Sequence, residues 1–187
     1  MAYSLANFIA DVNSRGVQPS HSFEVSWLSE PGGVTPITIR CEAVAAPGIS
    51  LISAEGPPRL GVGPQEQQPY GVIFDDVSLT FIEDSKSDII SYFDTWINRI
   101  VNFNSKGTAE SSYYVGYRSN YMTTVTITMF DSKKEPVKKI ILYRAYPHNI
   151  GSVPLSWEAS NEIVKLTVQF KYKYYNILKP GDEQFNT

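Results

Sequence analysis

Apolar and polar residues alternate along much of this chain with a period of two, which is the pattern of a half-buried β-strand. The longest run lies near the C-terminus, where Val164, Leu166, Val168, Phe170, Tyr172 and Tyr174 take every second position. The pattern predicts strands at residues 23–27, 37–43, 72–82, 124–130, 137–146 and 163–175. The first two flank Pro31-Gly32-Gly33, so we expect them to form a β-hairpin.

Two segments instead show the spacing of amphipathic helices. Residues 4–13 place four apolar side chains on one face, with Ser4 as the expected N-cap and Gly16 as the expected end. Residues 87–102 carry a longer stripe, capped by Asp84 or Ser85. Its apolar members are Ile89, Phe93, Trp96, Ile97 and Ile100. We expect the second helix to pack on the core.

Residues 56–71 contain four glycines and four prolines, with few apolar side chains. Long loops of this kind are commonly functional, and we expect an exposed excursion here. The tail at 176–187 is polar and is expected to be loosely held unless a neighbour binds it.

These elements predict the fold class. Strands that are each apolar on one side are typical of antiparallel sheets with one face in the core. We therefore expect a mainly β, single domain over residues 1–187. Two packed antiparallel sheets would form a barrel-like sandwich, with one flanking α-helix and a short N-terminal helix.

Composition narrows the function classes. The net charge of −3 lacks the basic footprint of a nucleic-acid binder. The single cysteine excludes an internal disulfide framework and fits a reducing compartment. The N-terminus does not resemble a signal peptide, and no apolar run is long enough to span a bilayer. We expect a soluble protein made in the cytosol.

Residues with catalytic or metal-binding potential are few. His21 and His148 have no partners at metal-ligand spacing, and His148 is interpreted as a turn residue beside Pro147. Cys41 falls on an inward position, so we expect an inert thiol. We therefore predict no enzyme, no metal and no cofactor.

Three further patterns have ordinary structural explanations. The glycines of 61–64 lack the Lys-Ser/Thr of a phosphate loop. Asp75 and Asp76 are interpreted as exposed strand-end acids rather than a catalytic pair. The lysines of the last strand are expected to form a solvated face or an inter-subunit charge partner, rather than a nucleic-acid stripe; they are Lys165, Lys171 and Lys173.

The order of several motifs carries a family resemblance. The strongest is a turn followed by a corner, formed by Tyr146, Pro147, Asn149, Ile150, Gly151, Trp157, Asn161, Glu162 and Ile163. Upstream lie an Ala-x-Pro-Gly step at 45–48, a Phe-Asp-Asp strand start at 74–80, and a helix with Phe93 and Trp96. This order is similar to that of tail tube proteins of contractile-tailed, myovirus-type bacteriophages and of phage-like contractile injection systems.

The resemblance implies a structural role in the virion tail, assembled in the host cytoplasm. Six copies would form a ring whose inner strands merge into one barrel, and stacked rings would make a tube that conducts DNA. The implied partners are other copies of the chain, the tail sheath, a baseplate tube initiator, a tape measure protein in the lumen and, in passage, double-stranded DNA. A conduit of this kind should have a neutral or acidic lumen, because basic side chains would hold phosphates.

The excursion at 56–71 resembles the hairpin by which such proteins reach an adjacent ring. Its candidate contact residues are Pro58, Arg59, Leu60, Gly61, Val62, Gly63, Gln65 and Gln67. We predict that deleting Pro58–Gln68 leaves a folded chain that no longer polymerises.

Other interpretations remain open from sequence. The chain could be a baseplate tube initiator, or the tube subunit of a tailocin or secretion-type injection system. A monomeric carbohydrate-binding β-sandwich is the alternative outside this class, suggested by the tyrosine content and by Tyr113-Tyr114.

Overall fold

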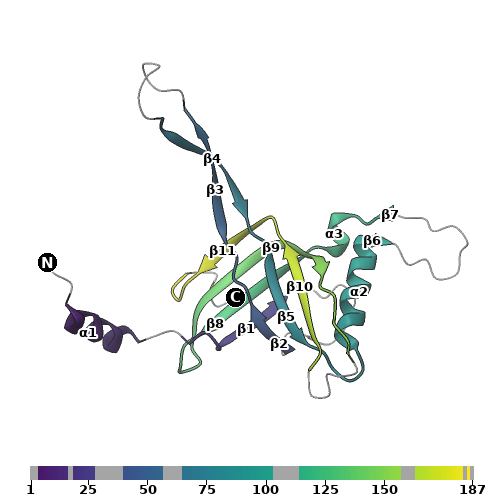
Figure 1. Ribbon diagram of the computed structural model, residues 1–187, viewed down its shortest axis with the longest axis horizontal. Helices are drawn as coiled ribbons and strands as arrows, with labels where there is room; N and C mark the ends of the chain where they lie inside the picture. The colour runs from purple at the N-terminus through teal and green to yellow at the C-terminus, as the bar shows by residue number, and fades with distance from the viewer. Residues whose placement is uncertain are drawn as a thin grey trace, which may run out of the picture.

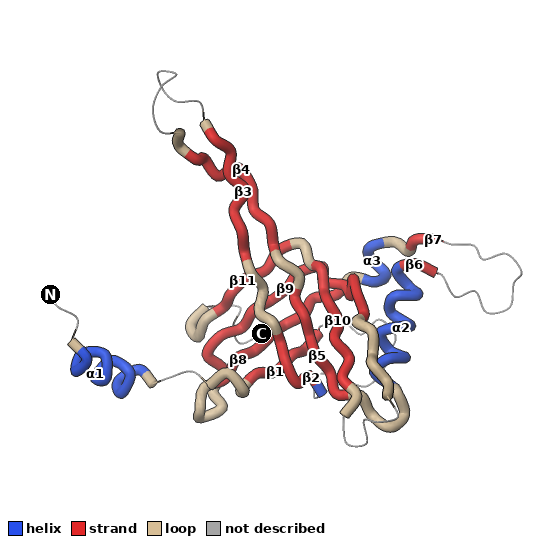
Figure 2. The backbone as a smooth tube through the Cα atoms, viewed as in Figure 1, coloured by secondary structure: helices blue, strands red, loops and turns tan. Residues whose placement is uncertain are grey.

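The computed structural model describes residues 4–16, 19–27, 40–56, 65–102, 114–156, 163–182 and 185. Strands dominate, with one long helix beside them and one helix apart near the N-terminus (Figures 1 and 2). In chain order the elements are α1 (Leu5–Arg15), β1 (Phe23–Trp27), β2 (Cys41–Val44), β3 (Ile49–Glu55), β4 (Gln67–Phe74), β5 (Val77–Ile82), α2 (Asp88–Ile100), β6 (Val101–Asn102), β7 (Tyr114–Val115), α3 (Arg118–Tyr121), β8 (Thr123–Phe130), β9 (Pro136–Ile150), β10 (Lys165–Lys171) and β11 (Tyr174–Leu178).

Seven strands form one antiparallel arrangement in the order β1-β8-β9-β10-β5-β2, with β11 also paired to β9. The 15-residue strand β9 belongs to two layers. Its first half lies between β8 and β11, and its second half pairs with β10. The result is two four-stranded sheets, β1-β8-β9-β11 and β9-β10-β5-β2, that share β9. The prediction of a mainly β fold with two packed antiparallel sheets is confirmed.

The predicted hairpin between the first two strands is wrong. β1 pairs with β8 and β2 pairs with β5, so these strands lie at opposite ends of the sheet order. A cavity of about 560 Å³, whose lining includes Phe23 of β1 and Val44 of β2, opens between them. Local turn signals misled the prediction, because the complementary apolar faces belong to strands far along the chain.

The core lies between the two sheets and under α2. On β5 and β10 every second residue is buried, as the alternation predicted, and on β8 the same holds from Thr123 to Ile127, whereas Met129 is half-buried. The α2 stripe closes the core, with the Phe93 ring 5.2 Å from that of Phe81. The indole nitrogen of Trp96 donates to the Tyr121 carbonyl at 2.8 Å, which satisfies the one polar atom of this fully buried side chain.

Helix α1 has the caps that its sequence suggested: the Ser4 hydroxyl accepts from Asn7 N, and Gly16 ends the helix with a positive φ of 72°. At α2 neither Asp84 nor Ser85 occupies the N-cap position, which belongs to Ser87 with a positive φ of 57° and no side-chain cap bond. The Asp84 carboxylate nevertheless accepts from Asp88 N, in the first turn of α2, at 3.0 Å. No helix in the described part of the chain is long and apolar enough to cross a membrane.

Two predicted strands are each divided in the structure. The stretch at 72–82 is two strands, since β4 already begins at Gln67 and ends before Asp75 and Asp76. The stretch at 163–175 is also two strands, β10 and β11, separated by Tyr172 and Lys173. In each case the chain passes from one sheet or hairpin to another. The alternation of apolar and polar residues continues across the change, so the sequence does not show where one strand ends and the next begins.

The alternation that places Cys41 inward in the predicted strand 37–43 also predicts an inward Ala43, and this prediction is wrong. A bulge between Cys41 and Ala43 shifts the pairing of β2 with β5. Cys41 and Val44 therefore pack on the core while Ala43 is exposed. A single extra residue in a strand reverses the side on which the following residues point.

Candidate functional site

The four-stranded sheet β1-β8-β9-β11 ends in two strands that each have one neighbour among the described residues. β1 lies on β8 and β11 lies on β9, so the outer backbone groups of both strands are available for further pairing. Free edges of this kind are the usual route by which sheets from separate chains join. The sheet therefore has two potential assembly edges, one at each side.

The face of this sheet that points away from the core is mostly polar. The strand register places hydroxyl side chains next to one another on this face, and few of its residues are charged. The residues of this face, which we call the outer face, are Glu24, Ser26, Thr124, Thr126, Thr128, Val137, Lys139, Ile141, Tyr143, Tyr174, Asn176 and Leu178. The face carries one acid and one base, so it is close to neutral.

The C-terminal tail is held more closely than predicted. Asn176 and Leu178 belong to β11, and Phe185 is only 4% exposed. The Lys139 ammonium donates to the Phe185 carbonyl and lies 5.1 Å from the centre of its ring. The one base of the outer face is thus engaged by the chain's own tail.

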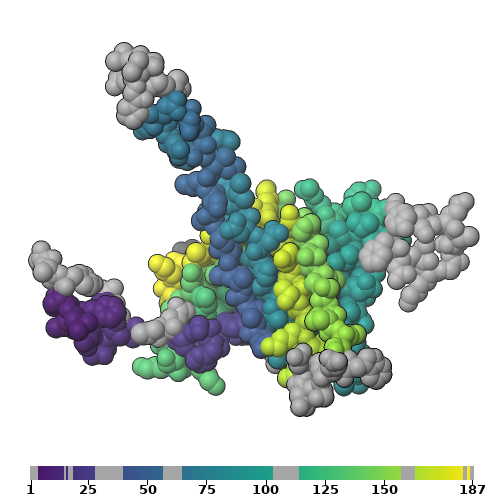
Figure 3. Space-filling model, in the orientation of Figure 1, coloured from purple at the N-terminus to yellow at the C-terminus, as the bar shows by residue number. Residues whose placement is uncertain are grey.

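Strands β3 and β4 form a two-stranded hairpin that projects from the body (Figures 1 and 3). One face aligns Ile49 with Phe74 and Leu51 with Val72. Phe74 packs at the root on rings of the body, but Leu51 and Val72 are 65% and 48% exposed. An isolated two-stranded hairpin is marginally stable in water, so this bare face is suited to burial against a partner.

Helix α1 stands apart from the sheets (Figure 1) and exposes apolar side chains among the residues that the structure describes. Leu5 is 75% exposed, and Phe8 and Ile9 are each at least half exposed, although all three lie on its apolar face. Helices of this length are weak in isolation, and their stability comes from packing an apolar face. The structure thus contains a second element whose apolar side chains face outward.

The predicted signature turn is partly a strand. β9 continues through Pro147 to Ile150, so both the strand end at 146–147 and the interpretation of His148 as a turn residue are wrong. Pro147 pairs with Phe170 and Asn149 with Gln169, which leaves His148 as the extra residue of a bulge. A bulge tolerates a proline within a strand because the ladder is already interrupted there.

The signature residues nevertheless make specific contacts. The Tyr146 ring lies 5.5 Å from that of Tyr121, and the Asn149 amide donates to the Gln169 side chain at 3.3 Å. Gly151 N donates to the Thr167 carbonyl at 2.7 Å, and a Cβ on Gly151 would lie 3.1 Å from that oxygen. These residues fix the course of β9 against β10.

The remaining predicted residues are placed as follows. Trp157, Asn161 and Glu162 lie outside the described residues, as do the loop residues Pro58, Arg59, Leu60, Gly61, Val62 and Gly63. Gln65 and Gln67 are described and exposed at the far end of the hairpin. Sequence analysis missed β3 as a strand, although Ile49 and Leu51 alternate with Ser50.

The lysines of the last strand have two different environments. Lys165 forms an ion pair with Glu42 at 2.7 Å, which fits the expectation of a compensated charge. Lys171 and Lys173 instead line a cavity with Arg118 and Arg144. Sequence analysis did not connect these residues, because they come from four separate segments.

Groups with chemical potential elsewhere are isolated. Burial raises the pKa of the Cys41 thiol to about 11, which disfavours the reactive thiolate. His21 and His148 are both exposed, and no cluster of three potential metal ligands occurs in the described ranges. Burial, followed by the charges of Tyr175, Asp75 and Asp76, raises the pKa of Tyr172 to about 12. These groups offer no catalytic arrangement.

Comparison with known structures gives matches over nearly the whole chain. A chain of the anti-feeding prophage (AFP) baseplate matches with a TM-score of 0.64 at 17% identity, covering 86% of this chain and 95% of its own. A chain of the PVC extracellular contractile injection system sheath–tube complex, in the extended state, matches with a TM-score of 0.61 at 16% identity, covering 95% of this chain and 99% of its own. The anti-feeding prophage tube-terminating cap gives a TM-score of 0.62 at 14% identity, covering 88% and 93%.

No curated protein matches the sequence. The structural matches are all far below 25% identity, so they establish a common fold. The family model described as "Phage tail tube protein" matches residues 7–178, which includes every strand and the long helix. The chain therefore belongs to the phage tail tube protein family, a family of structural proteins rather than enzymes.

Proposed function

We propose that this chain is the ring-forming subunit of the inner tube of a contractile tail, in which six copies close a ring and stacked rings conduct DNA. The observation that carries the proposal is the sheet β1-β8-β9-β11, which combines two free edges with a polar outer face. A sheet of this kind can continue from copy to copy.

The edges suggest how the ring closes. β1 of one copy would pair with β11 of the next, so each copy would contribute four strands to one continuous barrel. The contact joins two different edges, and a contact of that kind closes into a ring when the rotation between copies allows it. Closure would remove every free edge of the inner sheet, which otherwise favours uncontrolled aggregation.

The outer face suits the wall of a DNA conduit. Threonine, serine and asparagine side chains keep it wetted, while Glu24 and the tail-bound Lys139 leave little net charge. Each uncompensated Lys or Arg on such a wall would add salt-dependent affinity for phosphates and slow the passage of DNA. We therefore assign the outer face to the lumen.

The projecting elements suit contacts beyond the inner barrel. We propose that the β3–β4 hairpin, including Gln65 and Gln67 at its far end, reaches a neighbouring copy and supports the stacking of rings. The matched chains come from a sheath–tube complex, a baseplate and a cap. A sheath outside the tube, a baseplate initiator at its end and a tape measure protein inside it are the corresponding partners here.

A second candidate is the tube of a phage-like contractile injection system. The solved structures at TM-scores of 0.61 and above include such systems. The fold of the subunit is shared by both kinds of machine. Capsid and DNA-packaging genes beside the gene for this chain would favour the phage tail, and their absence beside an otherwise complete sheath and baseplate cluster would favour the injection system.

Electron microscopy of the purified chain tests the proposal. We expect six-fold rings or hollow tubes as concentration rises, or on addition of the baseplate complex that nucleates the tube. A chain that remains monomeric at every concentration and with that complex present would contradict the proposal.

A further inference from the structure

A basic cavity of about 330 Å³ lies where α3, the middle of β9 and the link between β10 and β11 meet. Four cationic side chains line it: Arg118, Arg144, Lys171 and Lys173. The other walls are three tyrosines and a methionine, which give it an apolar surface between the charges. We call it the basic pocket.

The path of β9 positions Arg144 in this pocket. Tyr143 pairs with Tyr174 of β11, whereas Tyr146 pairs with Lys171 of β10, so β9 changes partners between them. At the change Arg144 has a positive φ of 55°, a conformation that non-glycine residues seldom adopt. The same kink brings Lys171 and Lys173 beside it, and Lys173 N donates to the Tyr143 carbonyl at 3.0 Å.

The four cations are uncompensated in the part of the chain that the structure describes. No acidic side chain lines the pocket, and none of the four takes part in an ion pair or side-chain hydrogen bond. By contrast, Arg40 is paired with Asp84 at 3.0 Å. The Tyr172 hydroxyl is already occupied by the Asp75 carbonyl at 2.8 Å. Like charges held this close repel one another, so the pocket favours an anionic occupant.

The β3–β4 hairpin carries acidic side chains, whose charge is opposite to that of the basic pocket. Its described part carries two charged residues, Glu55 and Glu66, both exposed near its far end. Glu55 ends β3 and pairs with Gln67, and Glu66 directly precedes β4, with its carbonyl accepting from Gly56 N at 3.0 Å, so the two acids lie at the same end of the hairpin.

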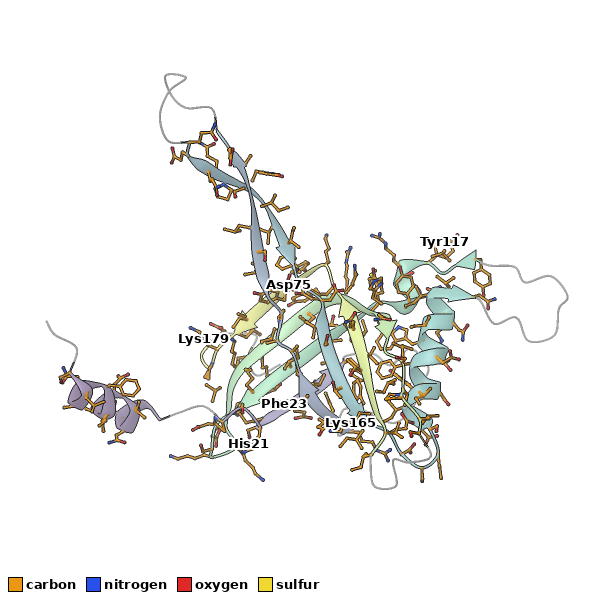
Figure 4. The ribbon with its side chains drawn as sticks, viewed as in Figure 1. His21, Phe23, Asp75, Tyr117, Lys165 and Lys179 are labelled. Carbon is orange, nitrogen blue, oxygen red and sulfur yellow. The ribbon has the colours of Figure 1, made fainter. Side chains whose placement is uncertain are left out.

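The geometry points to a second copy of the chain as the source. The hairpin root at Asp75 lies beside Tyr172 of the same chain, and the hairpin then leads away from the body (Figure 4). Seven strand residues extend it by about 23 Å, so its acidic end lies far from its own pocket. We propose that the basic pocket of each copy binds the acidic end of a neighbouring copy's hairpin through carboxylate–ammonium and carboxylate–guanidinium contacts.

This inference rests on the proposed function only in requiring that copies assemble. A hairpin-to-pocket contact joins two different surfaces, so it repeats from copy to copy in one direction. Because all six side chains are exposed, the contact should weaken as salt rises. The contact with the basic pocket gives the hairpin a specific binding site on the neighbouring copy, which its exposed apolar face alone does not define.

A charge-exchange experiment tests the contact. The variants are Lys171→Glu with Lys173→Glu, Glu55→Lys with Glu66→Lys, and all four together, each compared with wild type in sedimentation and electron microscopy at low salt. We expect each double variant to lower the sedimented fraction at least tenfold, and the quadruple variant to restore it to within twofold. Lys133→Glu with Lys134→Glu, which reverses two exposed lysines of the β8–β9 turn, is the matched control and should assemble normally.

The outcomes separate the inference from the proposed function. Tubes that form equally well in both double variants, or a quadruple variant that stays unassembled although folded, would overturn the pocket contact and leave the tube intact. Loss of wild-type assembly under every condition would reject both. Inorganic phosphate is the competing occupant: if it binds wild type but not Lys171→Glu with Lys173→Glu, and charge exchange restores nothing, the pocket is a free-oxyanion site.

Cross-linking gives an independent measure of proximity. In a Cys41→Ser background, Glu66→Cys with Lys173→Cys should give a ladder of disulfide-linked copies in assembled material. Each single cysteine variant is the control and should give at most dimers. A double variant that assembles into tubes without a ladder would contradict the contact.

Discussion

The body of the molecule and the β3–β4 hairpin are both built from antiparallel strands, but they differ in where their apolar residues lie. In β5 and β10 the alternate residues are buried against α2 and the opposite sheet. In the hairpin the corresponding residues, Leu51 and Val72, remain in solvent. The body buries its apolar faces within a single chain, whereas the hairpin has no second layer among the residues that the structure describes.

This difference separates stability from assembly. Burial of apolar area in the body supplies the folding free energy, so substitutions there should unfold the chain. The same kind of side chain in the hairpin contributes little to the monomer and should matter only when copies meet.

Trp96→Ala should destabilise the isolated chain by about 3–5 kcal/mol. It removes a fully buried side chain and the hydrogen bond from its indole nitrogen to Tyr121. Chemical denaturation of the monomer measures the loss. Tyr117→Ala, at an 82% exposed aromatic, is the control and should change the free energy of unfolding by about 0.5 kcal/mol or less. Equal losses would contradict the division.

Leu51→Ser with Val72→Ser should prevent tube formation while the free energy of unfolding changes by less than about 1 kcal/mol. Both side chains are largely exposed, so the monomer loses little burial, but the hairpin loses the apolar face that a neighbour would cover. Sedimentation measures assembly, and denaturation measures stability. Ser50→Asn, on the opposite face, is the control; normal tubes from the double variant would contradict the role of the face.

Ile177→Lys should stop ring closure with a still smaller effect on folding. Ile177 is 44% exposed on β11, and a lysine on an edge strand opposes pairing with another chain. Val137→Lys, at a residue of β9 that is 38% exposed, is the matched control and should leave rings intact. Electron microscopy distinguishes the two, and normal rings from Ile177→Lys would argue against β11 as an assembly edge.

The burial of Cys41 should affect only the reactivity of its thiol and the stability of the chain at high pH. With a folded-state pKa of about 11 against 9.0 for the ordinary thiol, alkylation of the folded chain at pH 8 should be about a hundredfold slower than that of a free thiol. The raised pKa contributes stability below pH 9, which is lost as pH rises from 9 to 11 because the unfolded thiol ionises first. Rapid alkylation of the folded protein would contradict the burial.

Local patterns predicted much of the body. Alternation identified the buried faces of β5, β8 and β10, and helical spacing identified α2 and its apolar stripe, although not its N-cap residue, Ser87. These features depend on near neighbours in sequence. The pairing of β1 with β8 depends instead on surfaces brought together by the whole fold, so a nearby turn signal gave the wrong partner.

The candidate assembly surfaces were less predictable for the same reason. The residue types at 56–71 indicated an excursion, but not that β4 begins at Gln67 and pairs with β3. The basic pocket required the kink at Arg144 to gather cations from distant segments. Its residues looked like separate exposed charges in the sequence.

Hydrogen–deuterium exchange, compared between the monomer and assembled tubes, shows which strands become buried when copies assemble. If the hairpin and the free edges are the assembly surfaces, amides of β3, β4, β1 and β11 should become protected on assembly, while those of β5, β8 and β10 are already protected in the monomer. Unchanged exchange in β3 and β4 within intact tubes would contradict the account.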